Sequence, residues 1–168
     1  MELFDAIDTR SSAGRLTSPG PSREDLDRLL QAAARAPDHG RLKPWRFIVL
    51  NEADREPFAG AAAEAKRARL PTLTEEQVAS DREKILRSPT IIVAACVVDR
   101  GNSKVPEIEQ VIAVGAAVEN LFLAAHGLGY AVMWKTGAAA YDPGVKAVLG
   151  LQPADHIVAI LHLGTRSK

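Results

Sequence analysis

Cysteine is nearly absent from this sequence: Cys96 is the only one among 168 residues. One cysteine cannot form an intramolecular disulfide or a cluster of thiolate ligands, so we expect a protein of a reducing compartment. Cys96 lies in the apolar run 91–98, where a cysteine is typically a small buried hydrophobe rather than a nucleophile. The four histidines lack zinc spacing, so no structural metal is expected.

An excess of charge is also missing, because 21 Lys and Arg residues balance 21 Asp and Glu residues. The chain therefore has no overall basic field to attract nucleic acid or an anionic membrane. Aromatic residues make up 5% of the chain, too few for a platform that stacks single-stranded bases. The N-terminal residues lack a basic stretch followed by an apolar run, so no leader peptide is expected, and no segment is expected to supply the roughly 20 apolar residues of a membrane span. We expect a cytoplasmic protein with no nucleic-acid and no membrane partner.

Several enzyme motifs are absent as well. The sequence has no Gly-x-Ser-x-Gly elbow and no Walker loop, so it does not support a serine hydrolase or a P-loop NTPase. Gly127-Leu128-Gly129 follows an expected helix and precedes an expected strand, which is the reverse of the order in a dinucleotide-binding loop. We interpret Gly127 as the C-cap of that helix instead.

Apolar residues are abundant, at 46% of the chain, which predicts one domain over residues 1–168 with a sizeable core. The continuous apolar run 90–98 predicts a strand buried on both faces. Pro106 opens the longest helical pattern, whose apolar residues go most of the way round, so we expect a buried central helix or a subunit interface. The remaining expected helices are 2–8, one capped by Ser22, 54–68, one over 74–87 that begins with a Thr74–Gln77 capping box, and one opened by Asp142-Pro143. The remaining strands are 46–50, 130–135 and 156–163, and the last of them is expected to end in a turn at 164–166.

The loop between the second helix and the first strand is rich in polar residues. Pro37 and Pro44 disfavour helix for the residues that precede them, so the segment between them is expected to be extended or turned. Arg35, His39 and neighbouring cations could serve an anionic ligand there. An ordinary solvated connection between a helix and a strand is the alternative.

A second polar segment follows the N-terminal helix, where Arg10 precedes Ser11 and Ser12. A guanidinium binds phosphate through two hydrogen bonds and hydroxyls add further donors, so these residues could hold a phosphate. The same residue types are common in ordinary surface loops, so the pattern alone leaves both interpretations open.

Taken together, these segments resemble the signature of the nitroreductase family, in its small single-domain branch with an Ala-Pro-Asp-His loop. The resemblance implies an α+β fold, in which helices flank a central mixed or largely antiparallel sheet, and a homodimer with two FMN sites at the interface. Lys43 departs from the pattern, because relatives commonly have Gln before Pro-Trp. The segments that carry the resemblance keep the family order over nearly the whole chain: 10–12, 35–39, 43–47, the helix after Pro106, 134–137 and 164–166.

The resemblance implies specific contacts to the flavin phosphate and ribityl chain. Arg10, Ser11 and Ser12 fall at the position of the family's Arg-x-Ser, which holds these groups. Arg166 follows the Gly-Thr that ends the last core strand and would reach the phosphate. Arg15 lies in the same block but receives no firm role.

The resemblance also implies contacts to the flavin ring. Trp134, Lys135 and Thr136 correspond to the strand end beside the isoalloxazine, where a backbone N–H points toward N5. Arg35 and His39, from the Ala-Pro loop, are further expected contacts to the flavin, and no particular group of the cofactor is implied for them. His39 is expected to reach the cofactor of the other subunit.

The implied activity is that of an FMN-dependent oxidoreductase. NADH or NADPH would deliver hydride to flavin N5, and an electron-poor acceptor such as a nitroaromatic or a quinone would then take two electrons. No side chain is required as catalytic acid or base. Two alternatives stay open: another flavin chemistry on the same scaffold (dehalogenation, ene reduction or flavin fragmentation), and a protein that stores flavin or mediates an interaction without turnover.

Overall fold

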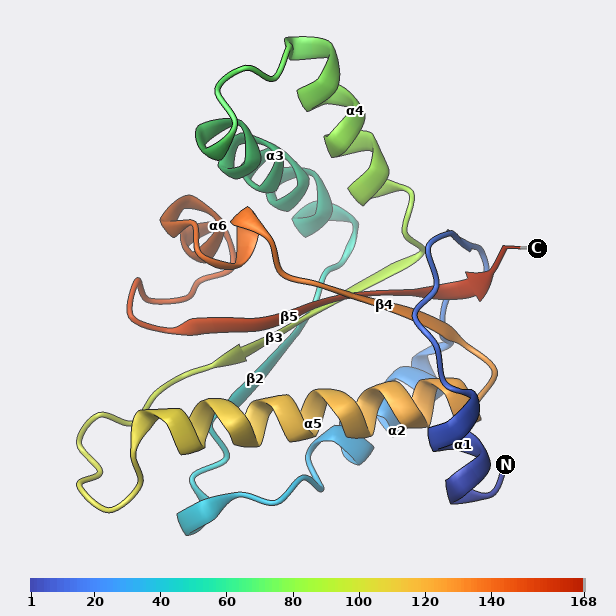
Figure 1. Ribbon diagram of the computed structural model, residues 1–168, viewed down its shortest axis with the longest axis vertical. Helices are drawn as coiled ribbons and strands as arrows, with labels where there is room; N and C mark the ends of the chain where they lie inside the picture. Colours follow the sequence, from blue (N-terminus) through green and yellow to red (C-terminus); the bar gives the residue numbers. More distant parts are fainter. Residues whose placement is uncertain (168) are drawn as a thin grey trace.

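A central antiparallel sheet organises residues 1–167, which are the residues that the computed structural model describes (Figure 1). Its strands follow the order β1-β5-β3-β2, and β4 also pairs with β5. All four pairings among these residues are antiparallel, which confirms the expected α+β class with a largely antiparallel sheet. The strands are β1 (Leu16–Thr17), β2 (Trp45–Val49), β3 (Thr90–Cys96), β4 (Ala131–Lys135) and β5 (His156–Arg166).

Helices cover both faces of this sheet (Figure 1). One face carries α1 (Leu3–Thr9), α2 (Arg23–Ala33) and the long α5 (Glu107–Gly127). The other carries α3 (Glu52–Arg69) and α6 (Pro143–Val148), and α4 (Glu75–Leu86) packs on α3. Two short 3-10 turns complete the described chain, η1 (His39–Arg41) and η2 (Ala138–Ala140).

Strand β3 joins the two hydrophobic cores because its alternate side chains point to opposite faces. Ile92 and Ala94 pack against α2 and α5, whereas Ile91 and Val93 pack against α3 and α6. Residues 91–96 of this strand are all buried, as the continuous apolar run predicts.

Local capping explains where several helices begin. The Ser22 side chain accepts a hydrogen bond from the Asp25 backbone N–H at the start of α2. Thr74 forms a capping box with Gln77 at the start of α4, and Asp142 accepts from a backbone N–H of α6. These caps are the ones that the sequence predicts.

Two expected boundaries are wrong. Helix α5 continues through Gly127, and the residue that leaves it with a left-handed backbone is Gly129, at φ 86°. Strand β5 runs through Gly164-Thr165-Arg166, where a turn was expected, and its end pairs with β1. Glycine is needed at 164 because a Cβ there would lie 2.8 Å from the Thr17 carbonyl oxygen.

Helix α5 also corrects the expectation that no segment is apolar enough for a membrane span. It is long enough to cross a membrane, with a mean hydropathy of 1.5, judged by length and composition. Burial within the protein explains its apolar composition, because Val114, Val118 and Leu121 are fully buried against the sheet. Ile108 and Ile112 remain 62% and 63% exposed on the side away from the core.

Candidate functional site

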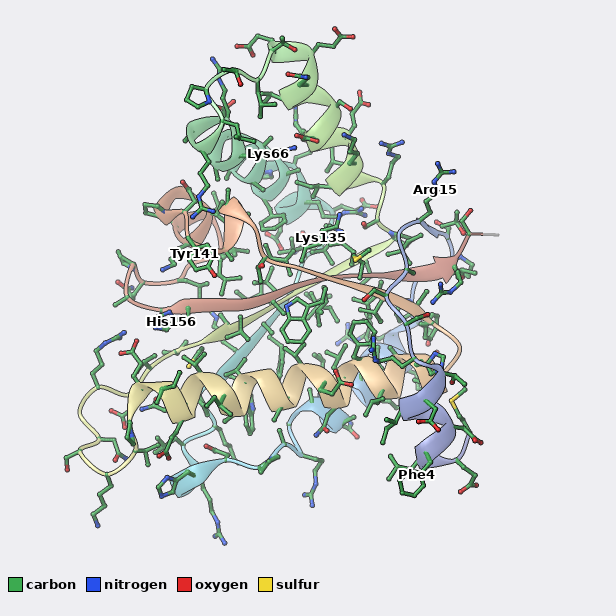
Figure 2. The ribbon with its side chains drawn as sticks, in the orientation of Figure 1. Phe4, Arg15, Lys66, Lys135, Tyr141 and His156 are labelled. Carbon is green, nitrogen blue, oxygen red and sulfur yellow. The ribbon has the colours of Figure 1, made fainter. Side chains whose placement is uncertain are left out.

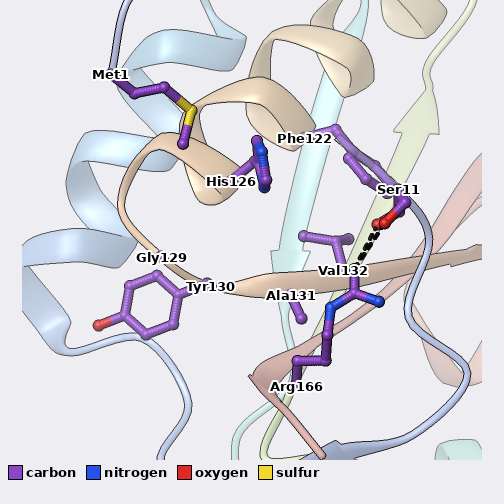
Figure 3. Close-up of a pocket in the computed structure, with 9 residues that line it drawn as sticks. All are labelled: Met1, Ser11, Phe122, His126, Gly129, Tyr130, Ala131, Val132 and Arg166. Atoms are coloured by element: carbon purple, nitrogen blue, oxygen red, sulfur yellow. Dashed lines mark hydrogen bonds between the residues drawn. The ribbon is translucent and has the colours of Figure 1, made fainter. Parts of the chain in front are cut away.

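Two hollows lie beside β4 and the N-terminal segment 10–17. The larger, which we call the cationic cavity, has a volume of about 680 Å³ and is lined by segment 13–17, the end of α4, β4 and β5. The smaller, which we call the small pocket, has a volume of about 250 Å³ and lies between α5, β4 and Arg166 (Figure 3).

The cationic cavity is named for its charged lining: Arg15, Lys84, Arg87 and Lys135. Within residues 1–167, no acidic side chain lines it. Lys84 pairs with Asp81 at 3.0 Å, whereas the side chains of Arg15, Arg87 and Lys135 form no hydrogen bond or ion pair with the described residues. Figure 2 shows Arg15 and Lys135 on the side of the sheet that carries α3 and α4. Unpaired cations in one cavity favour an anionic ligand.

Burial changes the protonation equilibria of two groups in this cavity. Desolvation lowers the pKa of the Lys135 ammonium from its usual value. Burial also lowers the pKa of the His162 imidazole to about 4, with further lowering by the cations Lys135 and Arg55. His162 is therefore neutral near pH 7, and its Nδ1 lies 2.6 Å from the Ser88 hydroxyl oxygen.

The residues expected to bind the flavin phosphate do not line the cationic cavity. Arg166 donates to the Ser11 hydroxyl at 2.8 Å and to the Ser11 carbonyl at 3.1 Å, and both residues line the small pocket (Figure 3). The Arg10 guanidinium carbon lies 4.9 Å from the centre of the Phe122 ring, and its Nε lies 3.7 Å from the Glu119 carboxylate. The structure therefore brings Ser11 and Arg166 together, and it places the Arg10 side chain against Phe122 and Glu119 of α5.

Side chains alternate along β4, so Trp134 and Lys135 point to opposite faces of the sheet, whereas Ser12 and Thr136 lie outside the strand. Ser12 is exposed, and the next residue binds β4 through its backbone N–H. Lys135 lines the cationic cavity, but the indole of Trp134 donates to the Val158 carbonyl at 3.2 Å. Thr136 is exposed and follows the strand. Of the three residues at this strand end, only Lys135 lies in the cavity.

The two residues from the Ala-Pro loop lie elsewhere. Arg35 is exposed just after α2, and His39 Nδ1 lies 2.5 Å from the Glu109 carboxylate in the first turn of α5. Glu109 and Phe122 are about 20 Å apart along the helix axis at 1.5 Å per residue. Within one chain, His39 is therefore far from the Ser11–Arg166 pair.

Sequence reasoning missed most of the residues that line the cavity, among them Lys84, Arg87, Ser88 and His162. The signal for His162 was present, since it is the one polar residue in the apolar run Ile160-Leu161-His162-Leu163. The cations at the end of α4 gave no comparable signal, because charges on a surface helix usually face solvent.

Comparisons with known proteins agree with this architecture. The model of the nitroreductase family matches residues 7–165. The Escherichia coli protein named "Putative NAD(P)H nitroreductase YdjA" is 35% identical over 167 residues, covering 98% of this chain and 88% of that protein.

Solved structures give the same result. A nitroreductase-like family protein from Bacillus cereus superposes with a TM-score of 0.80 at 27% identity, covering 100% of this chain and 87% of that one. A Desulfovibrio desulfuricans protein, described as a putative nitroreductase in complex with FMN, superposes with a TM-score of 0.76 at 25% identity, covering 100% of this chain and 88% of that one. The chain belongs to the nitroreductase family.

Proposed function

We propose that the protein is an FMN-dependent oxidoreductase of nitroreductase type and that the cationic cavity holds the cofactor. The observation that carries this proposal is the cavity of about 680 Å³ with three unpaired cations and no acid among its described lining residues. The family relative from Desulfovibrio desulfuricans is in complex with FMN, which supports the choice of cofactor.

The residues of the cavity suit both the phosphate and the ring of FMN. A phosphate needs cationic and hydrogen-bonding donors, which Arg15, Arg87 and Lys135 supply. The flavin ring needs an apolar surface, and Leu16 and Met133 contribute one. When bound, FMN supplies the hydride-accepting N5 and two-electron chemistry.

The residues predicted for the phosphate receive a revised role. Arg10, Ser11, Ser12 and Arg166 would have to turn away from their present surroundings to reach the cationic cavity. We propose instead that the Arg166–Ser11 hydrogen bonds fix the segment that carries Arg15, and that Arg15, Arg87 and Lys135 make the direct contacts. Trp134 and Thr136 flank Lys135 at the strand end and remain proposed ring contacts through their backbone.

The proposed reaction takes hydride from NADH or NADPH and passes two electrons to an electron-poor acceptor such as a nitroaromatic or a quinone. The chain supplies binding, orientation and positive charge, which stabilises the electron-rich reduced cofactor. A general acid or base isn't required, and none of the described lining residues is a carboxylic acid. We propose that this occurs in the cytoplasm.

We also propose a homodimer through the exposed apolar side chains of α1 and α5. Phe4 is 76% exposed and Ile112 is 63% exposed, and these two helices contact each other. A second copy would bury these side chains and place Arg35 and His39 of one chain near the cofactor of the other.

The double substitution Phe4→Ser and Ile112→Ser should shift the protein from dimer to monomer in light scattering, and a wild-type monomer would contradict the proposal. Lys146→Gln, on the other face, is the control.

The cofactor proposal is tested on the purified protein. We expect a flavin absorption spectrum, or its appearance after FMN is added, and bleaching when NADH or NADPH is added without oxygen. Failure to retain or take up FMN would overturn the cofactor assignment. A retained flavin that neither nicotinamide bleaches would favour flavin storage over turnover.

A further inference from the structure

His162 lines the cationic cavity and is only 3% exposed. It pairs across the sheet with Met133, which lines the same cavity, and its neighbours Leu161 and Leu163 point into the opposite core. The strand therefore places one imidazole among apolar residues and aims it at the space that the cations surround.

The ring is held from one side only. Its Nδ1 is 2.6 Å from the Ser88 hydroxyl oxygen, while no described residue forms a hydrogen bond with Nε2. Among the described residues, Nε2 of His162 is not one of the fully buried side-chain atoms that lack a hydrogen-bond partner. It therefore keeps some exposure, and the cavity is the space that it faces. A histidine with a purely structural role would normally satisfy both nitrogens, since an unmade buried hydrogen bond is costly.

Ser88 is itself fixed by α3. The Arg55 guanidinium donates to the Ser88 carbonyl and to the Leu86 carbonyl at the end of α4. Ser88 is buried, so its hydroxyl has little freedom apart from rotation toward His162. The chain of contacts Arg55, Ser88 and His162 thus runs from α3 to the cavity and holds the imidazole through its Nδ1.

We propose that Nε2 of His162 is a direct hydrogen-bonding contact for the flavin in the cationic cavity, and that Ser88 and Arg55 are positioning residues for it. This inference rests on the proposed function, because it concerns the ligand of the same cavity. In a neutral imidazole, Nε2 either donates or accepts one hydrogen bond. Carbonyl and ring nitrogen atoms of an isoalloxazine, or hydroxyls of a ribityl chain, can be the partner. The surrounding cations attract the anionic cofactor, and the hydrogen bond from or to His162 orients it.

The sense of the hydrogen bond depends on the tautomer. If the Ser88 hydroxyl donates to Nδ1, then Nε2 carries the proton and donates to the ligand. If Nδ1 donates to Ser88, then Nε2 accepts. Nitrogen NMR of the imidazole in wild-type protein distinguishes the two states before any ligand is added.

The first test therefore uses wild-type protein with labelled histidine, titrated with FMN. We expect the Nε2 resonance of His162 to shift more than its Nδ1 resonance, because only Nε2 gains a partner. FMN uptake that leaves both His162 nitrogens unchanged would overturn the inference. This measurement requires no variant, so it stands even where a substitution impairs folding.

The second test measures the dissociation constant of FMN and the midpoint potential of the bound flavin in variants. His162→Phe keeps a ring but removes Nε2, and we expect roughly 2- to 10-fold weaker binding, the effect of one neutral hydrogen bond. His162→Gln can return an amide to the same region and should recover part of that loss. Ser88→Ala should shift the imidazole resonances and weaken FMN binding by a smaller factor.

His156→Phe is the matched control, because it makes the same substitution on the same strand at the end that pairs with Glu107. Its FMN affinity and flavin potential should equal those of the wild type. If His162→Phe also leaves both quantities unchanged while the wild type binds FMN, the inference is wrong and the proposed function stands. If the wild type binds no FMN, both fail.

Discussion

The two hollows beside β4 differ in what their cations already contact. Around the small pocket, Arg166 is bound to Ser11, and nearby Arg10 is engaged by Phe122 and Glu119. In the cationic cavity, the side chains of Arg15, Arg87 and Lys135 form no hydrogen bond or ion pair with the described residues. The number of cations near a cavity is therefore a weak guide to ligand binding, because a guanidinium that already has partners must lose those interactions before it binds a ligand.

The largest effect should follow from removing two unpaired cations of the cationic cavity. Arg15→Gln with Arg87→Gln removes two charge-assisted donors, so FMN binding should weaken by on the order of 100-fold or more. Isothermal titration or fluorescence quenching measures this change. Arg23→Gln is the control, since Arg23 is 90% exposed and lies on α2. Equal affinities in the double variant and the control would mean that the cavity does not bind the phosphate.

A second prediction concerns the pH dependence of stability. The folded-state pKa of His162 is lowered from 6.5 to about 4 by burial, and the cations Lys135 and Arg55 act in the same direction. The unfolded chain therefore binds a proton that the folded chain excludes, so stability falls as pH drops from about 6.5 toward 4 and this contribution is constant above 6.5. The difference corresponds to roughly 3 kcal/mol at the acid end.

This pH effect can be separated from that of the carboxylates by substitution. Chemical unfolding of the wild type and His162→Gln at several pH values should give free energies whose difference changes over the interval from about 6.5 to 4. A pH-independent difference would show that His162 titrates normally. The lowered pKa of Asp81, caused mainly by its hydrogen bond with Lys66, acts equally in both proteins and cancels.

The smallest effect is expected at the small pocket. Ser11→Ala removes one hydrogen bond from Arg166, and FMN binding should weaken by only about 2- to 5-fold, because the change acts through the position of Arg15. Affinity measured by the same titration makes the comparison direct. A loss as large as that in the Arg15 and Arg87 double variant would restore Ser11 and Arg166 as the primary phosphate contacts.

Part of the fold could be read from the sequence because it depends on local rules. The caps at Ser22, Thr74 and Asp142 act over three residues, and the two-sided burial of β3 follows from its unbroken apolar run. The end of α5 was misjudged because Gly127 and Gly129 offer the same local signal. Only the geometry of the following residues decides which glycine leaves the helix.

The candidate site was less predictable. Lys135 is an expected site residue that lines the cationic cavity, and the expected site residues Ser11 and Arg166 meet beside the small pocket. Their partners could not be read from the sequence, because a hydrogen bond between residues 155 positions apart depends on the pairing of β5 with its neighbours.

The helices, most strand positions and the family resemblance follow from periodicity, capping and ordered motifs, which are local properties of the chain. Tertiary structure decided which charges converge and which are already bound. Arg15, Arg87, Lys135 and His162 come from four separate segments, and antiparallel pairing of β4 with β5 beneath the end of α4 brings them to one cavity. Each is unremarkable in its own segment, because the availability of a side chain to a ligand depends on everything else within its reach.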